Sequence, residues 1–252
     1  IMASHSDSPS FKIKENPEME SEGHYIRLNV ERYGGMLFAP WFDRPLSVAG
    51  RVIVKDPSTD GKPSACFLSK LVNIDRDLLM IPNLAIHMDR DANNGHKYNA
   101  QKDMLPLYGD LTAKNTFFHS ISEAANVTGD EILGHHLFLY NRQEPCIWGA
   151  SREFLSAPRL DDLQCAFASL KGFLSGAKED YLALHCVFDN EEVGSGTKQG
   201  AASTFLADTL IRINHAMGRD EAGYRQSIAN SFMLSADNAH GVHPNHTDKA
   251  CP

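Results

Sequence analysis

Polar and apolar side chains alternate in the first part of the chain, as they do in half-buried strands. In residues 24–33 every second side chain is apolar, at Ile26, Leu28 and Val30, so one face of a strand is expected to be buried. Four further apolar runs predict strands at 48–55, 65–74, 78–87 and 134–141, and a turn-rich loop over 56–64 makes the first two a hairpin. Residues 10–150 are therefore predicted to form a β-rich domain.

The pattern changes after residue 150. Apolar side chains at helical spacing, from Leu163 to Leu174, follow Pro158 and predict an amphipathic helix that ends near Gly176. Residues 181–188 form a near-continuous apolar run typical of a strand covered on both faces, residues 198–217 predict a second helix, and residues 231–236 predict another buried strand. This succession predicts an α/β layer sandwich.

The start of the chain completes the predicted organisation. If residues 1–6 are also a strand, an α/β domain made of residues 1–9 and 151–252 is interrupted by the inserted β-rich domain of residues 10–150. Acidic and histidine side chains then follow three of the strands: His5 and Asp7, Glu191 and Glu192, and Asp237. Because ligands in open α/β sheets gather at the carboxyl ends of strands, these side chains are expected to share one site.

The residue types at this expected site suit a metal. Two adjacent glutamates at the end of a buried strand need a compensating cation or base. Zinc binds histidine nitrogen and carboxylate oxygen, and a possible ligand set is His5, Asp161, Glu192 and Asp237. Glu191 would then be free to act as general base toward a metal-bound water, and Asp7 could orient the imidazole of His5.

Simpler interpretations compete for several of these residues. A histidine such as His5, taken alone, is more often a hydrogen-bonded structural residue, and paired glutamates more often begin a solvated helix. For Asp162 a structural role is at least as good an explanation as a catalytic one. An independent metal site at His240, His243 and His246 is disfavoured, because Pro244 interrupts their spacing.

Composition and charge exclude some classes of partner. The chain has 252 residues and a formal charge of −8, so neither nucleic acid nor an anionic membrane is an expected partner. With no apolar run long enough to span a bilayer and no secretory pattern at the start, the sequence predicts a cytoplasmic protein. Five cysteines without a CxxC pair fit reduced thiols better than disulfides or a cysteine zinc site.

Four motifs, in order along the chain, carry a family resemblance. HSDSPSFKIK (5–14), RLDDL (159–163), DNEEVGS (189–195) and SADNAHGVHPN (235–245) resemble the motifs of aspartyl aminopeptidases, a family of co-catalytic di-zinc metallo-aminopeptidases, here in a bacterial form. The resemblance implies a zinc-exopeptidase-like α/β/α sandwich interrupted by an inserted β-rich dimerisation domain. It also implies hydrolysis of the N-terminal residue, possibly Asp or Glu, from peptides.

The resemblance further implies roles for single residues. One zinc would take His5, Asp161 and Asp237, the second would take Asp161 and Glu192, and Glu191 would be the general base. The peptide bond between Asp161 and Asp162 is expected to be cis.

Family members also need a histidine from a motif close to their C-terminus for the second zinc, and the sequence stops at Pro252 with no counterpart after it. The sequence is therefore expected to be a fragment cut at both ends, with an incomplete second metal site and doubtful activity of its own. Subunits of the family pair into dimers that build a dodecamer, and His87 of the insertion is expected to reach a neighbouring subunit's active site and bind substrate there.

Two other functions stay open. The protein could be a non-catalytic subunit that keeps the fold and the homo-oligomer, or a broad-specificity di-zinc aminopeptidase that prefers leucine.

Overall fold

The structure, a computed structural model, describes residues 1–56, 66–176 and 181–249. The chain divides into two compact units: the first unit comprises Ile1–Ser8 and Arg159–Pro252, and the second comprises Pro9–Pro158. The hairpin of β8 (Cys146–Trp148) and β9 (Phe154–Ser156) belongs to the second unit. The boundary at residue 150 expected from the sequence falls inside this hairpin.

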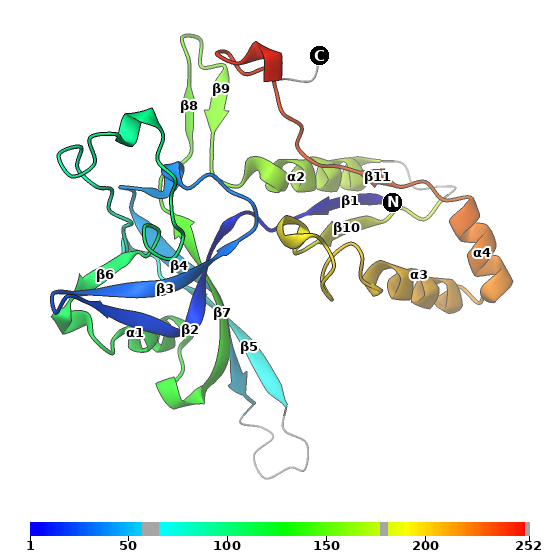
Figure 1. Cartoon of the computed structure of the whole chain (residues 1–252). Helices are drawn as coiled ribbons and strands as arrows, with labels where there is room; N and C mark the ends of the chain where they lie inside the picture. The colour runs from blue at the N-terminus through cyan, green and yellow to red at the C-terminus, as the bar shows by residue number, and fades with distance from the viewer. Residues whose placement is uncertain (57–65, 177–180, 250–252) are drawn as a thin grey trace. The chain divides into compact units, whose positions relative to one another are not determined.

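A six-stranded antiparallel sheet organises the second unit (Figure 1), in the order β5-β4-β7-β2-β3-β6. Its strands are β2 (Ser10–Ser21), β3 (Tyr25–Tyr33), β4 (Leu46–Lys55), β5 (Phe67–Asn73), β6 (Leu107–Asp110) and β7 (Ile132–Asn141). Helix α1 (Phe117–Ala125) adds Phe117 and Ile121 to the buried core of this unit. The predicted alternation in β3 is confirmed, since Ile26, Leu28 and Val30 are all buried.

Most strands predicted for this part of the chain are confirmed, as β3, β4, β5 and β7. The strand expected at 78–87 is wrong: Leu79, Met80 and Ile81 form only isolated bridges, and Pro82 has no N–H to continue a ladder. Most of the hairpin loop expected at 56–64 lies outside the described residues. The sequence pattern did not predict β2, β6, β8, β9 or α1.

The first unit holds a three-stranded parallel sheet in the order β10-β1-β11 (Figure 1). Its elements are β1 (Met2–His5), α2 (Leu160–Ser175), β10 (His185–Phe188), α3 (Phe205–Ala216), α4 (Glu221–Ala229) and β11 (Leu234–Ser235). Met2 lies against α2, where a Cβ added at Gly172 would come within 3.8 Å of its sulfur. Ala3 packs instead with Cys186, Phe188 and the Leu206 side chain of α3. Because neighbouring strand residues face opposite sides, helices cover both faces of β1, as in an α/β/α sandwich.

Several elements of the first unit differ from their predictions. Strand β10 begins only at His185, and Val187 is 41% exposed, so the expected cover on both faces is not found there. Helix α3 begins at Phe205 and not near residue 198, because the chain first makes a tight turn at Gly200, where a Cβ would lie 2.1 Å from the Ser195 carbonyl oxygen. Helix α2 agrees with its prediction, whereas α4 was not predicted.

Short 3₁₀ turns complete the described secondary structure, at Ala39–Trp41, Ala92–Asn94, Leu111–Ala113, Gly129–Glu131, Glu191–Val193 and Thr247–Lys249. In the part of the chain that the structure describes, no helix has the length and hydropathy required to cross a membrane. The thiols of Cys146, Cys165 and Cys186 are free.

Candidate metal site

His5 ends β1 at the carboxyl edge of the parallel sheet, and its ring is 6% exposed. Its Nδ1 lies 3.1 Å from the Asp7 carbonyl oxygen and 3.2 Å from Asp7 Oδ1. Both of these atoms can only accept hydrogen bonds, so Nδ1 carries the proton. The lone pair of Nε2 is therefore available to a metal, which is the usual arrangement of a metal-binding histidine.

Two carboxylates face Nε2 of His5. Asp161 Oδ1 lies 3.4 Å from it, and Glu191 Oε2 lies 3.9 Å from it. Two ligands that each sit about 2.0 Å from a tetrahedral zinc ion are separated by about 3.3 Å. The spacing between His5 and Asp161 therefore suits a shared zinc ion.

Asp161 and Asp162 interrupt the first turn of α2. The peptide bond between them is cis, as expected, and neither residue has helical φ and ψ. The Asp161 side chain is 56% exposed, whereas Asp162 is fully buried and accepts the backbone N–H of His5 at Oδ2, over 3.1 Å. Adjacent carboxylates thus face different surroundings.

Asp162, for which a structural role was at least as good an explanation as a catalytic one, also lies at the site. Ligand atoms of His5, Asp162 and Asp237 all lie within 4.8 Å of one another. Asp162 Oδ1 is buried and has no hydrogen-bond partner among the described residues, which is costly for a carboxylate without a nearby cation. Burial, followed by the neighbouring Asp162 carboxylate, raises the pKa of the Cys165 thiol to about 11.

Glu191 and Glu192 lie on the 3₁₀ turn that follows β10, so they do not begin a solvated α-helix. Both backbone N–H groups donate to the Asp7 carboxylate, from Glu191 to Oδ1 and from Glu192 to Oδ2, each over 3.1 Å. Asn190 enters the turn with a φ of 61°, a conformation that asparagine tolerates. Asp7 therefore fixes both the imidazole of His5 and the glutamate turn, and the second contact was not foreseen from the sequence.

The charge balance of the site favours a bound cation. Burial, and then the charges of Glu191 and Asp7, raise the pKa of Glu192 to about 7. Burial, and then the charge of Asp237, raise the pKa of Asp161. Burial lowers the pKa of His5, but the surrounding carboxylates outweigh it and the pKa is raised. Because nearby carboxylates contribute to each of these shifts after burial, a divalent cation at the site would relieve part of them.

Other histidines singled out in the sequence lie elsewhere. His87 is an exposed residue of a turn in the second unit. His243 and His246 are exposed and their ring centroids are 4.9 Å apart. Within residues 1–56, 66–176 and 181–249, no second group of three ligand-type side chains has its ligand atoms all within 4.8 Å of one another, as one metal ion would require.

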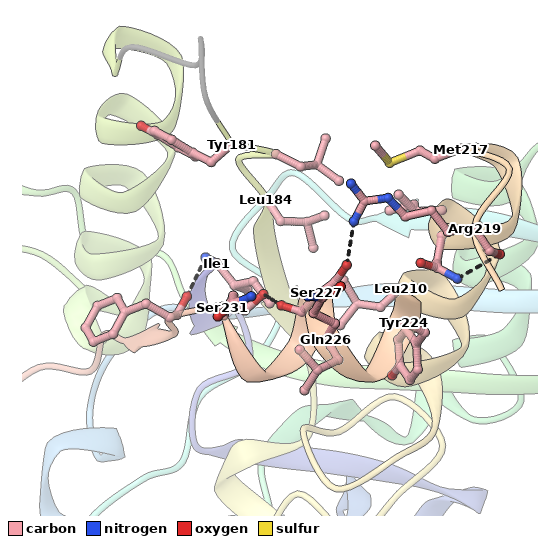
Figure 2. Close-up of a pocket in the computed structure, with 16 residues that line it drawn as sticks. Ile1, Tyr181, Leu184, Leu210, Met217, Arg219, Tyr224, Gln226, Ser227 and Ser231 are labelled. Carbon is pink, nitrogen blue, oxygen red and sulfur yellow. Dashed lines mark hydrogen bonds between the residues drawn. The ribbon is translucent and has the colours of Figure 1, made fainter. Parts of the chain in front are cut away.

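The first unit also contains a pocket of about 960 Å³ (Figure 2). Ile1, at the amino end of β1, lines it together with Leu184, Leu210 and Met217, and the Ile1 amino group donates to the Phe232 carbonyl oxygen over 2.8 Å. Ligand sites in parallel sheets gather at the carboxyl ends of strands, where His5 lies. The pocket is therefore not the candidate metal site.

Comparisons with known proteins assign this chain to a family. The family described as aminopeptidase I zinc metalloprotease (M18) matches residues 1–251. A probable M18 family aminopeptidase 2 of Clostridium acetobutylicum is 46% identical over 100% of this chain and 58% of its own length. A protein of the same name from Ectopseudomonas mendocina is 38% identical over 99% of this chain and 56% of its own.

Solved structures show the same similarity. Chaetomium thermophilum mApe1 superposes with a TM-score of 0.86 at 31% identity, covering 100% of this chain and 60% of that one. The S. cerevisiae mApe1 dodecamer superposes with a TM-score of 0.74 at 27% identity, covering 98% and 56%. This chain thus spans a little over half the length of the curated relatives it matches. It belongs to the M18 family of aminopeptidase I zinc metalloproteases.

Proposed function

We propose that this protein is a zinc-dependent aminopeptidase that hydrolyses the N-terminal residue from peptides. The observation that carries the proposal is the His5 ring, whose Nδ1 is held by Asp7 while Nε2 faces Asp161 at 3.4 Å and Glu191 at 3.9 Å. Family membership supports the same conclusion. In this proposal His5, Asp161 and Asp237 hold one zinc ion, and Asp161 and Glu192 contribute to a second.

Zinc, when bound, would supply Lewis acidity that makes a water more acidic and polarises the scissile carbonyl. The chain's own residues prepare the site for this chemistry. Asp7 keeps the proton on Nδ1 of His5 and thereby presents Nε2 as a ligand. The same carboxylate fixes the backbone at Glu191, whose side chain is 46% exposed and can accept the proton of an attacking water and pass it to the departing amine.

The state of assembly and the specificity are further parts of the proposal. A homo-oligomer of dimers arranged in a dodecamer is supported by the solved relative described as a dodecamer. The role of His87 at a neighbouring subunit's site and the cytoplasmic location remain predictions. A preference for Asp or Glu as the released residue also remains a prediction, and a preference for leucine is its alternative.

Glu191→Gln tests the proposed general base, because it removes the basic oxygen and keeps the size of the side chain. Turnover of aspartyl-, glutamyl- and leucyl-4-nitroanilide by the zinc-loaded protein should fall by about 10²–10⁴-fold, while bound zinc measured by atomic absorption stays near the wild-type value. Glu221→Gln, on the exposed start of α4, is the matched control and should leave turnover unchanged.

Three outcomes would change the proposal. Loss of zinc together with turnover in Glu191→Gln would make Glu191 a ligand and not the base. Zinc-loaded wild-type protein that is expressed from the complete gene and releases no nitroaniline would favour the non-catalytic oligomeric subunit. Release from the leucyl substrate alone would replace the acidic specificity with the leucine-preferring one.

A further inference from the structure

Asn238 follows the proposed ligand Asp237 and joins two parts of the first unit. Its Nδ2 donates to the Leu160 carbonyl oxygen over 2.6 Å, and the Cys165 thiol donates to its Oδ1 over 3.6 Å. The side-chain amide therefore links the segment after β11 to the first turns of α2. Because a carbonyl oxygen can only accept, the orientation of the amide is fixed, with Nδ2 toward Leu160.

Asn238 binds α2 beside its least regular residues. Asp161 and Asp162 depart from helical φ and ψ, so the carbonyl groups around them are not positioned by an ordinary helical turn alone. Two side chains from distant segments donate to neighbouring carbonyl oxygens here, Asn238 to that of Leu160 and Ser8 to that of Asp161 over 3.0 Å. The position of the Asp161 carboxylate thus depends on contacts from outside the helix.

Asp237 is held through both of its neighbours. On one side the Ala236 N–H donates to the Ala3 carbonyl oxygen of β1 over 2.8 Å, and β1 ends at His5. On the other side Asn238 is bonded to Leu160, the residue before Asp161. The backbone at Asp237 is therefore tied to the two segments that carry the other proposed ligands of the same zinc ion.

We propose that Asn238 is a positioning residue for the metal site, which holds Asp237 at the correct separation from Asp161. The inference rests on the proposed function, because it takes His5, Asp161 and Asp237 as ligands of one zinc ion. In this proposal Asn238 is not itself a zinc ligand and acts through the placement of Asp237.

Asn214 provides a matched control within the same unit. Its Nδ2 donates to the carbonyl oxygens of Arg219 and Asp220, so it also joins two segments by side-chain-to-backbone bonds, here α3 and the start of α4. Asn214→Ala should lower the free energy of unfolding without a specific effect on the metal. A residue that contributes only stability would behave like Asn214.

The test measures zinc affinity of the wild-type protein expressed from its complete gene and of the variants, by competition with a chromophoric chelator. Asn238→Ala should weaken zinc binding about 10–100-fold, as loss of a partner that orients a ligand typically does. Asn238→Asp is a second variant of the same shape that loses only the donor to Leu160 and adds a negative charge. That charge alone would attract zinc more strongly, so weaker binding in this variant must come from misplaced ligands.

Two further variants test the hydrogen bond from the Cys165 thiol to Asn238 Oδ1. Cys165→Ser keeps a donor to Oδ1 and should bind zinc within a few-fold of wild type, whereas Cys165→Ala should weaken binding, but less than Asn238→Ala. The visible spectrum of cobalt-substituted protein, which reports the geometry around the metal, should change in Asn238→Ala and stay unchanged in Asn214→Ala.

The outcomes separate this inference from the proposed function. If wild-type protein binds no zinc, the proposed function fails. If wild-type protein binds zinc and both Asn238 variants bind it equally well, the function stands and Asn238 is not a positioning residue. Equal weakening in Asn214→Ala and Asn238→Ala would assign Asn238 an ordinary structural role.

Discussion

His135 of β7 is a buried histidine with no hydrogen bond to either ring nitrogen among the described residues. Its side chain is 2% exposed, Phe118 packs against it at a centroid distance of 5.5 Å, and Glu15 Oε2 lies 3.7 Å from Nε2. Burial lowers the pKa of His135, and the charge of Lys12 lowers it further, although Glu15 opposes both. Burial therefore favours the neutral imidazole in the folded second unit.

This lowered pKa predicts how the stability of the second unit depends on pH. The pKa of His135 in the unfolded chain is about 6.5. Above this pH neither the folded nor the unfolded state binds the extra proton, so His135 does not lower the free energy of unfolding. As pH falls below 6.5, the unfolded chain takes up a proton that the folded chain does not, so the free energy of unfolding falls by up to about 1.4 kcal/mol per pH unit. His135→Leu should therefore show a shallower decline between pH 7 and pH 5 than wild type.

Urea unfolding followed by tryptophan fluorescence can measure this difference, because Trp41 and Trp148 both lie in the second unit. His119→Leu is the control, since His119 is 72% exposed and should give the wild-type slope. Identical slopes for wild type and His135→Leu would contradict the prediction.

Those residues of the candidate site that end a strand or closely follow one could be predicted from the sequence. His5, Glu191 and Glu192 each follow an apolar run, and the structure brings His5 and Glu191 to the same edge of the sheet. Contacts made by side chains across the fold could not be predicted. The bonds from Asp7 to the glutamate turn span 184 and 185 positions, and no local pattern encodes them.

At the scale of elements, helix α1 depends on a residue of β2. Its N-cap, Thr116, makes no side-chain capping bond, and the Glu18 carboxylate accepts the N–H groups of Asn115 and Phe117 instead. A carboxylate at this position satisfies free donors and interacts favourably with the helix dipole.

Glu18→Ala should lower the free energy of unfolding of the second unit by about 1–2 kcal/mol, as the loss of a helix cap does. The same urea titration would measure it. Glu20→Ala is the matched control, because Glu20 bonds only the exposed Lys114 side chain among the described contacts and its loss should change little. Equal effects of the two substitutions would show that Glu18 does not cap α1.

The elements that the sequence predicted best have an uninterrupted pattern, as β3 and α2 do. Strand β2 was missed because its pattern breaks: Pro17 lies within it, and the register with β3 shifts between Ile13 and Glu18. A bulge shifts the side chains that follow it to the opposite face of the sheet, so apolar and polar residues do not alternate with a simple period of two along the strand.

At the scale of the whole molecule, the proposed zinc ligands all lie in the first unit. A ligand that binds only the folded state stabilises it by about 2.7 kcal/mol at one hundred times its dissociation constant. Adding zinc to metal-free protein should therefore slow hydrogen exchange of amides in β1 and at residues 189–195, and leave β4 and β7 of the second unit unchanged.

Hydrogen exchange with mass spectrometry would test this prediction peptide by peptide. Calcium at the same concentration is the control, because it prefers six to eight oxygen ligands and would not be expected to use the imidazole of His5. An equal gain of protection in both units would show that they unfold as one.

Strand β1 is far in sequence from β10 and β11, the strands that it pairs with, and this separation affects folding during synthesis. Ser6 bonds to Phe188 across 182 positions, and the second unit, with its own core, is encoded between them. At about 5–20 residues per second, a ribosome takes roughly 10–40 s to synthesise that interval. During translation His5 therefore emerges long before β10, and the nascent β1 segment waits, unpaired, while the inserted sheet can already form.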